Sequence, residues 1–162
     1  MLCRLCFVEQ KVGSGRLKGK NNEELMSLLG PDFALINPEM VCGPLHLNQA
    51  AYLAGKAHEG KYNLSKDRST ELLLYLTAQR QISRAIEIAG IKPGIEAVAW
   101  VSFSQVPSKL FDLIETDESV ISHTDFDYSS LGLEKELLAK LSFDEKQKIV
   151  MTRTAALPVE SR

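Results

Sequence analysis

Residues 41–94 read VCGPLHLNQAAYLAGKAHEGKYNLSKDRSTELLLYLTAQRQISRAIEIAGIKPG, and two helical patterns lie back to back within this stretch. The first begins at Pro44, whose missing N–H group would be unpaired in a first helical turn anyway, and it fades at Gly60. The second and stronger pattern covers residues 69–90. These two predicted helices form the centre of the fold, because every other periodic segment is shorter and weaker.

The second predicted helix has two different faces when it is drawn on a wheel at roughly 100° per residue. The face that we expect to enter the core carries Leu72, Tyr75, Ala78, Ile82, Ala85, Ile86 and Ala89. The opposite face carries Leu73, Thr77, Arg80, Arg84, Glu87 and Ile88. Because a solvated helix face is usually plainly polar, two arginines beside aliphatic side chains favour a contact surface. The alternative is a solvated helix with two incidental aliphatic residues, which are normal when they occur singly.

The same stretch carries motifs of a known family. The matching residues are Gly43, His46-Leu47, Ala50, Ala54, Ala57, ELLLY at 71–75, QRQISRAI at 79–86 and GIKPG at 90–94. On these residues the chain resembles the KEOPS/EKC complex subunit that binds the small kinase of that complex, the PRPK-binding (TPRKB-like) protein family. The resemblance is strong over this stretch, and elsewhere it rests only on length and element order.

The resemblance implies a non-catalytic adaptor with an α+β fold. Such a subunit binds and stimulates the small kinase-like ATPase of the KEOPS complex, and it meets the other KEOPS subunits only indirectly. It also helps to recruit tRNA, through the 3′ CCA end, for threonylcarbamoyl-adenosine modification. These roles ask this chain for neither a cofactor nor a catalytic group, so the resemblance implies that it is not an enzyme.

Length and charge limit the possible functions. The 162 residues are enough to bury a core, and we expect one domain. Because the formal net charge is -2, any RNA contact has to come from a local basic patch. No apolar run reaches the length of a membrane span, and residues 1–10 lack the cleavage site of a signal peptide. Three cysteines without a secretory signal are typical of a reducing compartment, so we expect a cytoplasmic protein without a membrane partner.

Strand and helix signals alternate along the rest of the chain. Apolar runs predict strands at residues 2–12, 33–36 with 40–42, 96–103 and 149–157. Capping and breaker residues predict further helices at residues 22–29, 107–115 and 131–141, and one that starts with the capping box Ser142–Glu145. This order predicts an α+β fold, with a small mixed β-sheet packed with several α-helices in a single domain. We expect that domain to cover residues 1–157 and to be followed by a disordered tail at 158–162.

Two clusters of chemically capable residues are weak candidates for a site. Cys3 and Cys6 have C-x-x-C spacing, but no second ligand pair follows at zinc-site spacing. Two small buried apolar residues are therefore the favoured interpretation. His123, Asp125 and Asp127 lie close together in a predicted loop, but too few ligands and no nucleophile motif accompany them.

A glycine-rich run, GSGRLKG at residues 13–19, follows a predicted strand and precedes a helix, where a phosphate cradle would lie. Its spacing matches neither common phosphate motif, so we interpret it as a flexible loop. Arg16, Lys18 and Lys20 make this loop basic, and they leave a supporting phosphate contact open.

Two alternatives to the adaptor follow from these residues. A small enzyme would hold a phosphorylated substrate on the 13–19 run and use His58 or His123 as its base, and it would show a closed pocket joining the run to a histidine. A self-associating structural protein would bury Leu73 in a dimer. His46 supports neither alternative, because it falls on the core face of its helix and is predicted to be a hydrogen-bonded structural residue.

For the adaptor, the predicted site residues divide between two partners. RNA needs cations for phosphates and stacking surfaces for bases. We predict RNA contacts at Arg80 and Arg84, with Lys56, Lys61 and Lys92 as weaker candidates. A kinase contact needs an apolar patch with a polar rim, and for it we predict Leu73, Thr77 and Ile88. One helix face does not serve both partners at once, and the sequence leaves open which partner owns it.

Overall fold

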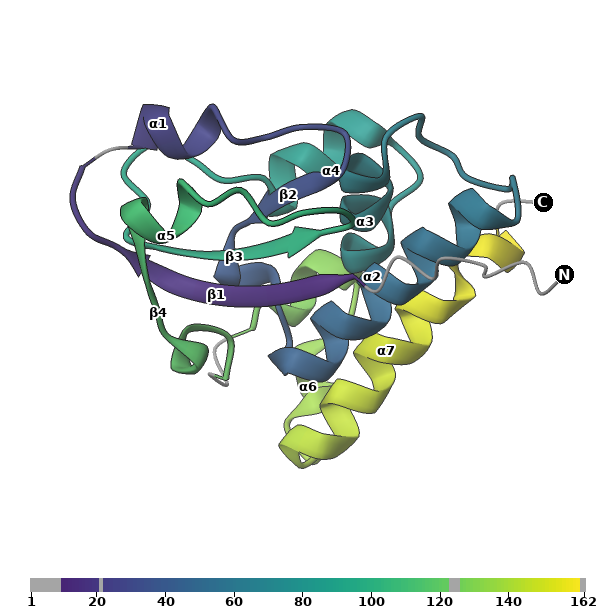
Figure 1. The fold of residues 1–162 in the computed structure, drawn as a ribbon. Coiled ribbons are helices and arrows are strands. Elements are labelled where there is room, and N and C mark those ends of the chain that lie inside the picture. Colours follow the sequence, from purple (N-terminus) through teal and green to yellow (C-terminus); the bar gives the residue numbers. More distant parts are fainter. Residues whose placement is uncertain (1–9, 21, 123–125, 161–162) are drawn as a thin grey trace, which may run out of the picture.

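The structure is a computed structural model that describes residues 10–20, 22–122 and 126–160 (Figure 1). The strands are β1 (Lys11–Leu17), β2 (Phe33–Ile36), β3 (Ala97–Ser102) and β4 (Ile114–Thr116). The α-helices are α1 (Asn22–Met26), α2 (Gly43–Glu59), α3 (Arg68–Thr77), α4 (Ile82–Ala89), α5 (Leu110–Leu113), α6 (Lys135–Leu138) and α7 (Phe143–Glu160). Short 3₁₀ helices are η1 (Pro38–Met40), η2 (Glu118–Ile121) and η3 (Tyr128–Leu131).

The four strands form one sheet in the order β2-β3-β1-β4, and every pairing between them is antiparallel. This confirms the predicted α+β class and the central strand at residues 96–103, but the sheet is antiparallel where we expected a mixed one. The reason is that α2, α3 and α4 return the chain to the end of β2. Gly90, just after α4, forms a bridge with Ile36, so β3 starts beside the point where β2 ends.

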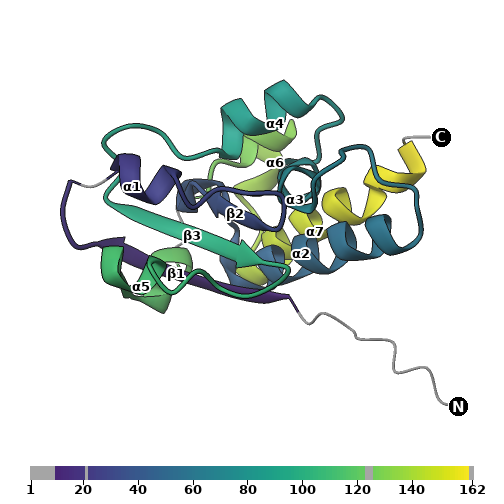
Figure 2. The same cartoon turned by 45° about the horizontal axis from the view of Figure 1, so that its top comes forward.

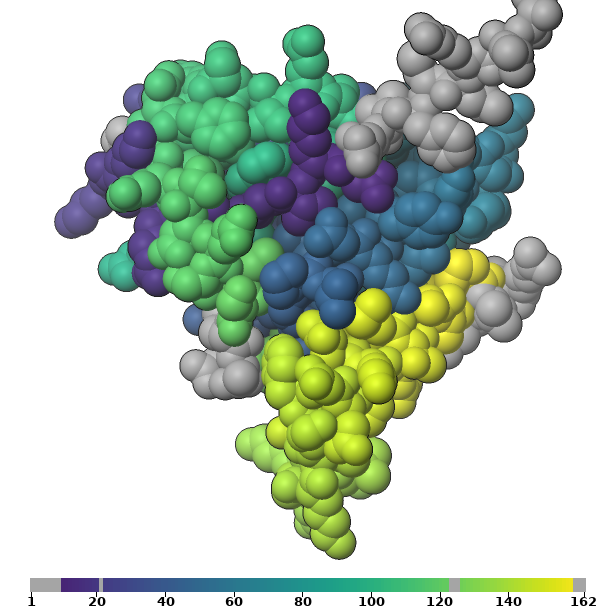
Figure 3. Space-filling view, turned by 60° about the horizontal axis from the view of Figure 1, so that its bottom comes forward, coloured from purple at the N-terminus to yellow at the C-terminus, as the bar shows by residue number. Residues whose placement is uncertain are grey.

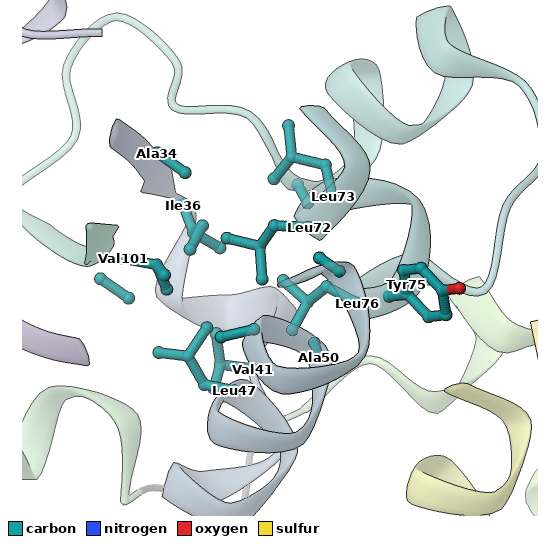
Figure 4. Packing of buried hydrophobic residues seen from close by; sticks show 14 of the residues in the cluster. Ala34, Ile36, Val41, Leu47, Ala50, Leu72, Leu73, Tyr75, Leu76 and Val101 are labelled. Carbon is teal, nitrogen blue, oxygen red and sulfur yellow. The ribbon is translucent and has the colours of Figure 1, made fainter. Parts of the chain in front are cut away.

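β3 sends alternate side chains into two buried clusters, as the two-residue period of a strand requires. Ala99 and Val101 belong to the cluster that contains α2 and α3, whereas Val98 and Trp100 belong to the cluster that contains α1 and α5. Figure 4 shows the first cluster, to which Leu47 of α2 and Val101 of β3 both belong. Helices therefore cover both faces of the sheet.

Residues 13–17 of the glycine-rich run belong to β1, so the interpretation of these residues as a flexible loop is wrong. Most of the predicted strand at residues 2–12 lies outside the described residues, and β1 covers Lys11–Leu17 instead. A Cβ atom at Gly13 would lie 2.5 Å from the indole ring of Trp100, and one at Gly15 would strike the backbone of β4. Glycine is needed here because the neighbouring ring and strand approach the backbone closely.

The helix predicted over residues 69–90 is two helices, α3 and α4, and the break between them lies at Ala78. Ala78 adopts the left-handed conformation with φ 50°. Its N–H group donates to the carbonyl oxygens of Leu74 and Tyr75, which ends α3 in the manner of a left-handed C-cap. α4 then starts at Ile82 and packs on α3.

The break corrects the predicted exposed face. Leu73 and Thr77 are only 8% and 3% exposed, and Thr77 Oγ1 donates a hydrogen bond to the Leu73 carbonyl oxygen at 2.7 Å. α3 packs against α2, α4, β2 and α7, so residues 71–77 are all buried, and Figure 4 shows Leu73 within the core. Conversely, Ile82 and Ile86 are 40% and 48% exposed, although the prediction of one continuous helix placed them on its core face.

The chain ends in a long helix. The predicted capping box is confirmed: the Ser142 N–H group donates to Glu145 at 2.8 Å, and the Glu145 N–H group donates to Ser142 Oγ at 3.3 Å. The helix that follows includes residues 149–157, so the strand predicted there is wrong. It also includes residues 158–160 of the predicted tail.

α7 lies side by side with α2 (Figures 1 and 3). The side-chain amide of Gln147 donates a hydrogen bond to the Cys42 carbonyl oxygen at 2.8 Å, next to the first residue of α2. That residue, Gly43, has φ +82°, and a Cβ atom on it would lie 2.5 Å from the Gln147 amide nitrogen. The start of α2 therefore requires glycine both for its backbone angle and for the approach of α7.

Candidate partner-binding site

α4 presents two isoleucines to solvent. The only buried residues of this helix are Ala85 and Ala89. None of its longer side chains is therefore fully buried in the core. Gly90 ends the helix by donating its N–H group to the Ile86 carbonyl oxygen at 2.8 Å. Ile82 and Ile86 are four residues apart and so lie on one side of the helix. Figure 2 shows α4 on the outside of the molecule, at the top of that view.

We use the name α4 face for the exposed residues on and just before α4, which are Ile82, Ile86 and the polar residues Arg80, Ser83, Arg84 and Glu87. Arg84 Nη1 donates to Glu87 Oε2 at 2.8 Å, in an ion pair that is itself exposed. Exposed aliphatic side chains together with charged and polar ones are a combination found in protein–protein interfaces. The α4 face is therefore chemically suited to a protein partner.

The predicted interface residues fall in different places. Leu73 and Thr77 are inside the core and closed to a partner, and Ile88 is half-buried on α4. The burial of Leu73 also removes the surface on which the self-association alternative rested. Sequence reasoning missed Ile82 and Ile86 because it continued one helix through Ala78. The signal that could have found them is the polar run of residues 79–81, which interrupts the apolar pattern.

The predicted RNA-contact residues do not form one patch. Arg80, Arg84 and Lys92 lie on or beside α4, whereas Lys56 and Lys61 lie at the C-terminal end of α2. Hydrogen bonds tie the start of α2 to the end of α3, and the loop after α2 to the first turns of α3. Arg80 and Lys61 are therefore separated by roughly the length of α3, which has 10 residues and is about 15 Å long.

The end of α2 carries a second group of residues, which we name the α2-terminus cluster: the exposed Tyr52, Lys61 and Tyr62 and the half-buried Lys56. Lys56 Nζ lies 5.6 Å from the centre of the Tyr52 ring and donates to Glu59 Oε2 at 3.0 Å. The hydrogen bond to Glu59 is the main reason why the pKa of Lys56 is raised. The sequence prediction included both lysines but missed both tyrosines, although Tyr52 and Lys56 have the i, i+4 spacing of neighbours on a helix.

A hollow of about 600 Å³ lies between the end of β1 and the turn before β3. Its charged lining residues are Arg16, Lys20 and Glu96. Arg16 Nε is paired with Asp117 Oδ2 at 2.7 Å, and hydrogen bonds from Ser119 and then Arg16 hold the pKa of Asp117 below its usual range. The small-enzyme alternative requires a histidine at such a hollow, but His58 is not among its lining residues.

His46 is a structural residue, as predicted. Its Nδ1 accepts a hydrogen bond from the Cys42 N–H group at 2.9 Å, and its Nε2 lies 3.1 Å from the Leu76 carbonyl oxygen. A neutral ring with hydrogen on Nε2 satisfies both contacts. Burial lowers the pKa of His46 to about 4, and burial raises the pKa of the Cys42 thiol. Neither group is placed to act on a ligand.

The remaining candidate clusters give no site in the described part of the chain. Cys3, Cys6, His123 and Asp125 lie outside the described residues. Asp127 accepts a hydrogen bond from a backbone N–H group and caps η3. Among the described residues, no group of three or more His, Cys, Asp or Glu side chains is placed to hold a metal ion. Nor does that part of the chain contain a helix with the length and apolar character needed to cross a bilayer.

A comparison with protein-family models assigns the chain to a family, whereas a search of curated proteins found no match. The model of the family described as kinase binding protein CGI-121 matches residues 18–147, which include β2, β3 and the whole of α2, α3 and α4. This match covers most of the chain and confirms the resemblance that the motifs of residues 41–94 indicated. The chain belongs to the CGI-121 family of kinase-binding proteins.

Proposed function

We propose that this chain is a non-catalytic adaptor of a KEOPS complex, which docks on the small kinase-like ATPase subunit through the α4 face and stimulates it. The observation that carries the proposal is the exposure of Ile82 and Ile86 on a helix that buries only alanines. Membership of a kinase-binding family supplies the partner. Burial of two neighbouring isoleucines removes apolar surface from water, and the charges of Arg80, Arg84 and Glu87 on or beside the same helix would help to orient the kinase.

The tRNA part of the proposal rests on the basic residues. Arg80 is exposed, and the described residues show no ion pair for it, whereas Arg84 shares its charge with Glu87. Both lie on or just before α4, so a kinase bound at this helix would have them close to its own surface. Since the chain has a net charge of -2, we propose that tRNA is held at the junction with the kinase and not by this chain alone.

Aspartate at Ile82 and Ile86 tests the kinase contact. Each substitution places a charge in the centre of the proposed interface, so we expect kinase affinity to fall roughly 30-fold or more per substitution. Stimulation of the ATPase should fall in parallel when the adaptor is not saturating. The readout is calorimetric titration of the kinase with each variant, after circular dichroism has confirmed folding.

Leu137→Asp is the matched control, because Leu137 is an exposed aliphatic residue on α6, away from α4. It should bind the kinase as the original chain does. Equal kinase affinity for Ile82→Asp, Ile86→Asp and Leu137→Asp would contradict the assignment of the α4 face.

Titration of tRNA with and without its CCA end, at two salt concentrations, tests the RNA part. The assembled kinase complex should bind the intact tRNA better and should lose affinity at high salt, because phosphate contacts release counterions. Arg80→Ala with Arg84→Ala should reduce the salt dependence. Equal binding of both tRNA forms would remove RNA recruitment from the proposal and leave the kinase contact standing.

A further inference from the structure

The hollow between the end of β1 and the turn before β3 has no part in the kinase contact. Its volume of about 600 Å³ is within the range of small-molecule sites. We propose that this hollow binds a small phosphate monoester that carries several hydroxyl groups, as phosphorylated sugars do. The proposal goes beyond the adaptor function, and it depends on neither the kinase contact nor the tRNA part of that function.

Two backbone hydrogen bonds hold the walls of the hollow. The Leu17 N–H group donates to the Glu96 carbonyl oxygen at 2.9 Å, and the Lys18 N–H group donates to the Leu113 carbonyl oxygen at 2.9 Å. The first bond ties the end of β1 to the residue before β3, and Figure 1 shows these two strand ends side by side at the left of that view. A cavity whose walls are already held loses little entropy when a ligand enters.

Two glycines leave room beside the backbone of the hollow. Gly19 and Gly94 both line it, and a Cβ atom added to either residue would meet no heavy atom within 4 Å. Gly94 also has φ +82°, which a residue with a side chain would adopt only with strain. The backbone at both positions is therefore accessible to a ligand.

Unpaired donors along the hollow favour a phosphate group. Lys20 is exposed, and the described residues give its ammonium group neither an ion pair nor a hydrogen bond. Nor does the described part of the chain supply an acceptor for the N–H groups of Gly19, Lys20, Gly94 and Ile95. Backbone N–H groups at turns are common ligands of anions, and a phosphate monoester offers them three terminal oxygens and a charge close to −2.

Arg16 adds little to the positive charge of the hollow. Its Nε is paired with Asp117 Oδ2 at 2.7 Å, and the low pKa of Asp117 keeps that carboxylate charged beside it. Lys20 is therefore the cation that a phosphate would meet, whereas Arg16 forms part of the wall.

Two acceptors in the same lining favour hydroxyl groups on the rest of the ligand. Asn22 Oδ1 is buried, and no described residue gives it a hydrogen bond. An unpaired buried acceptor is costly, and a hydroxyl donor would satisfy it. The Glu96 carboxylate also lines the hollow, where it accepts hydroxyl donors and repels a second anionic group. These acceptors favour a ligand with one phosphate and several hydroxyl groups over a chain of phosphates.

The test follows the amide NMR signals of Gly19 and Gly94 in the isotope-labelled chain as glucose 6-phosphate is added at constant ionic strength. We expect both signals to shift and to saturate, with inorganic phosphate binding more weakly and glucose not at all. Lys20→Gln should weaken glucose 6-phosphate binding roughly 10-fold or more, because it removes a charged hydrogen-bond donor. Asn22→Ala should weaken it roughly 5-fold and leave the binding of inorganic phosphate unchanged.

Lys18→Gln is the matched control, because it removes the same charge two residues away. Lys18 is not a lining residue, and its ammonium group already donates to the Phe111 carbonyl oxygen at 2.9 Å. This variant should bind glucose 6-phosphate as the original chain does. Circular dichroism confirms the folding of each variant first.

Three outcomes would overturn the proposal. The site is wrong if no probe gives a saturable shift, or if Lys20→Gln and Lys18→Gln bind glucose 6-phosphate equally well. Equal affinity for inorganic phosphate and glucose 6-phosphate, unchanged in Asn22→Ala, would show a bare-anion site. Displacement of glucose 6-phosphate by a single-stranded RNA octamer would make the hollow a nucleic-acid contact. Because the chain is tested without kinase or tRNA, each of these failures would leave the adaptor function standing.

Discussion

His46 joins the start of α2 to the end of α3 through the two nitrogens of one ring. The Cys42 N–H group reaches Nδ1, and Nε2 reaches the Leu76 carbonyl oxygen, so the neutral ring pairs two backbone groups that would otherwise be unsatisfied. Sequence alone predicted a structural histidine because the residue sits among apolar helix positions. It could not predict the partner on α3, which is 30 residues away in the chain.

Protonation of His46 should destabilise the fold. Its pKa is about 4 when folded against an ordinary value of 6.5, so the unfolded chain takes up the proton first as the pH falls. The stabilisation is fully present above pH 6.5 and is lost as the pH falls towards 4. We expect this residue to remove about 2 kcal/mol of the free energy of unfolding between pH 7 and pH 5.

Urea unfolding at pH 7, 6 and 5 measures this effect. His46→Gln keeps an acceptor and a donor on the side chain but cannot titrate, so its free energy of unfolding should vary less over the same range. An equal pH dependence in the original chain and in His46→Gln would assign the loss of stability to other groups.

The break between α3 and α4 decides which side chains reach solvent. Neither glycine nor proline marks it, and Ala78 is a residue type that favours a continuous helix, so residue propensity predicted one helix. Packing of α4 back on α3 outweighs that preference and turns Ile82 and Ile86 outward. The predicted helices at residues 107–115 and 131–141 were overextended for a related reason. Their α-helical parts, α5 and α6, have only four residues each. Strand β4 takes up residues 114–115, and turns, irregular segments and the end of η3 take up the rest.

Glycine at position 78 should stabilise the protein. A left-handed residue with a Cβ atom is strained, and glycine relieves this strain, while the loss of one methyl contact in the neighbouring cluster offsets part of the gain. We expect a net gain of about 0.5–1 kcal/mol in thermal unfolding. Ala155→Gly, at an exposed position within α7, should instead destabilise by about 1 kcal/mol. A loss of stability in both variants would show that the left-handed turn is not strained.

At the scale of the molecule, the helices that cover the two faces of the sheet leave two groups of exposed side chains with different chemistry. The sheet is covered by α2 and α3 on one face and by α1 and α5 on the other. α4 lies outside the first layer and carries isoleucines, whereas the end of α2 carries tyrosines and lysines. We therefore expect the kinase to cover α4 and to leave the end of α2 in solvent.

Local patterns predicted the α+β class, the helix that starts near Pro44, the strand at residues 96–103 and the capping box at Ser142. They failed where tertiary contacts decide the result. Gly13 and Gly15 look like loop residues until Trp100 and β4 are seen against them. Leu73 and Thr77 were predicted to be exposed and are buried, because exposure at residues 73–88 depends on the turn at Ala78.

Hydrogen–deuterium exchange of the chain, alone and bound to the kinase, tests the central claim most directly. The account predicts that kinase binding slows exchange chiefly at residues 80–90 and leaves residues 52–66 unchanged. Protection at residues 52–66, with α4 exchanging as in the free chain, would contradict the assignment of the α4 face to the kinase.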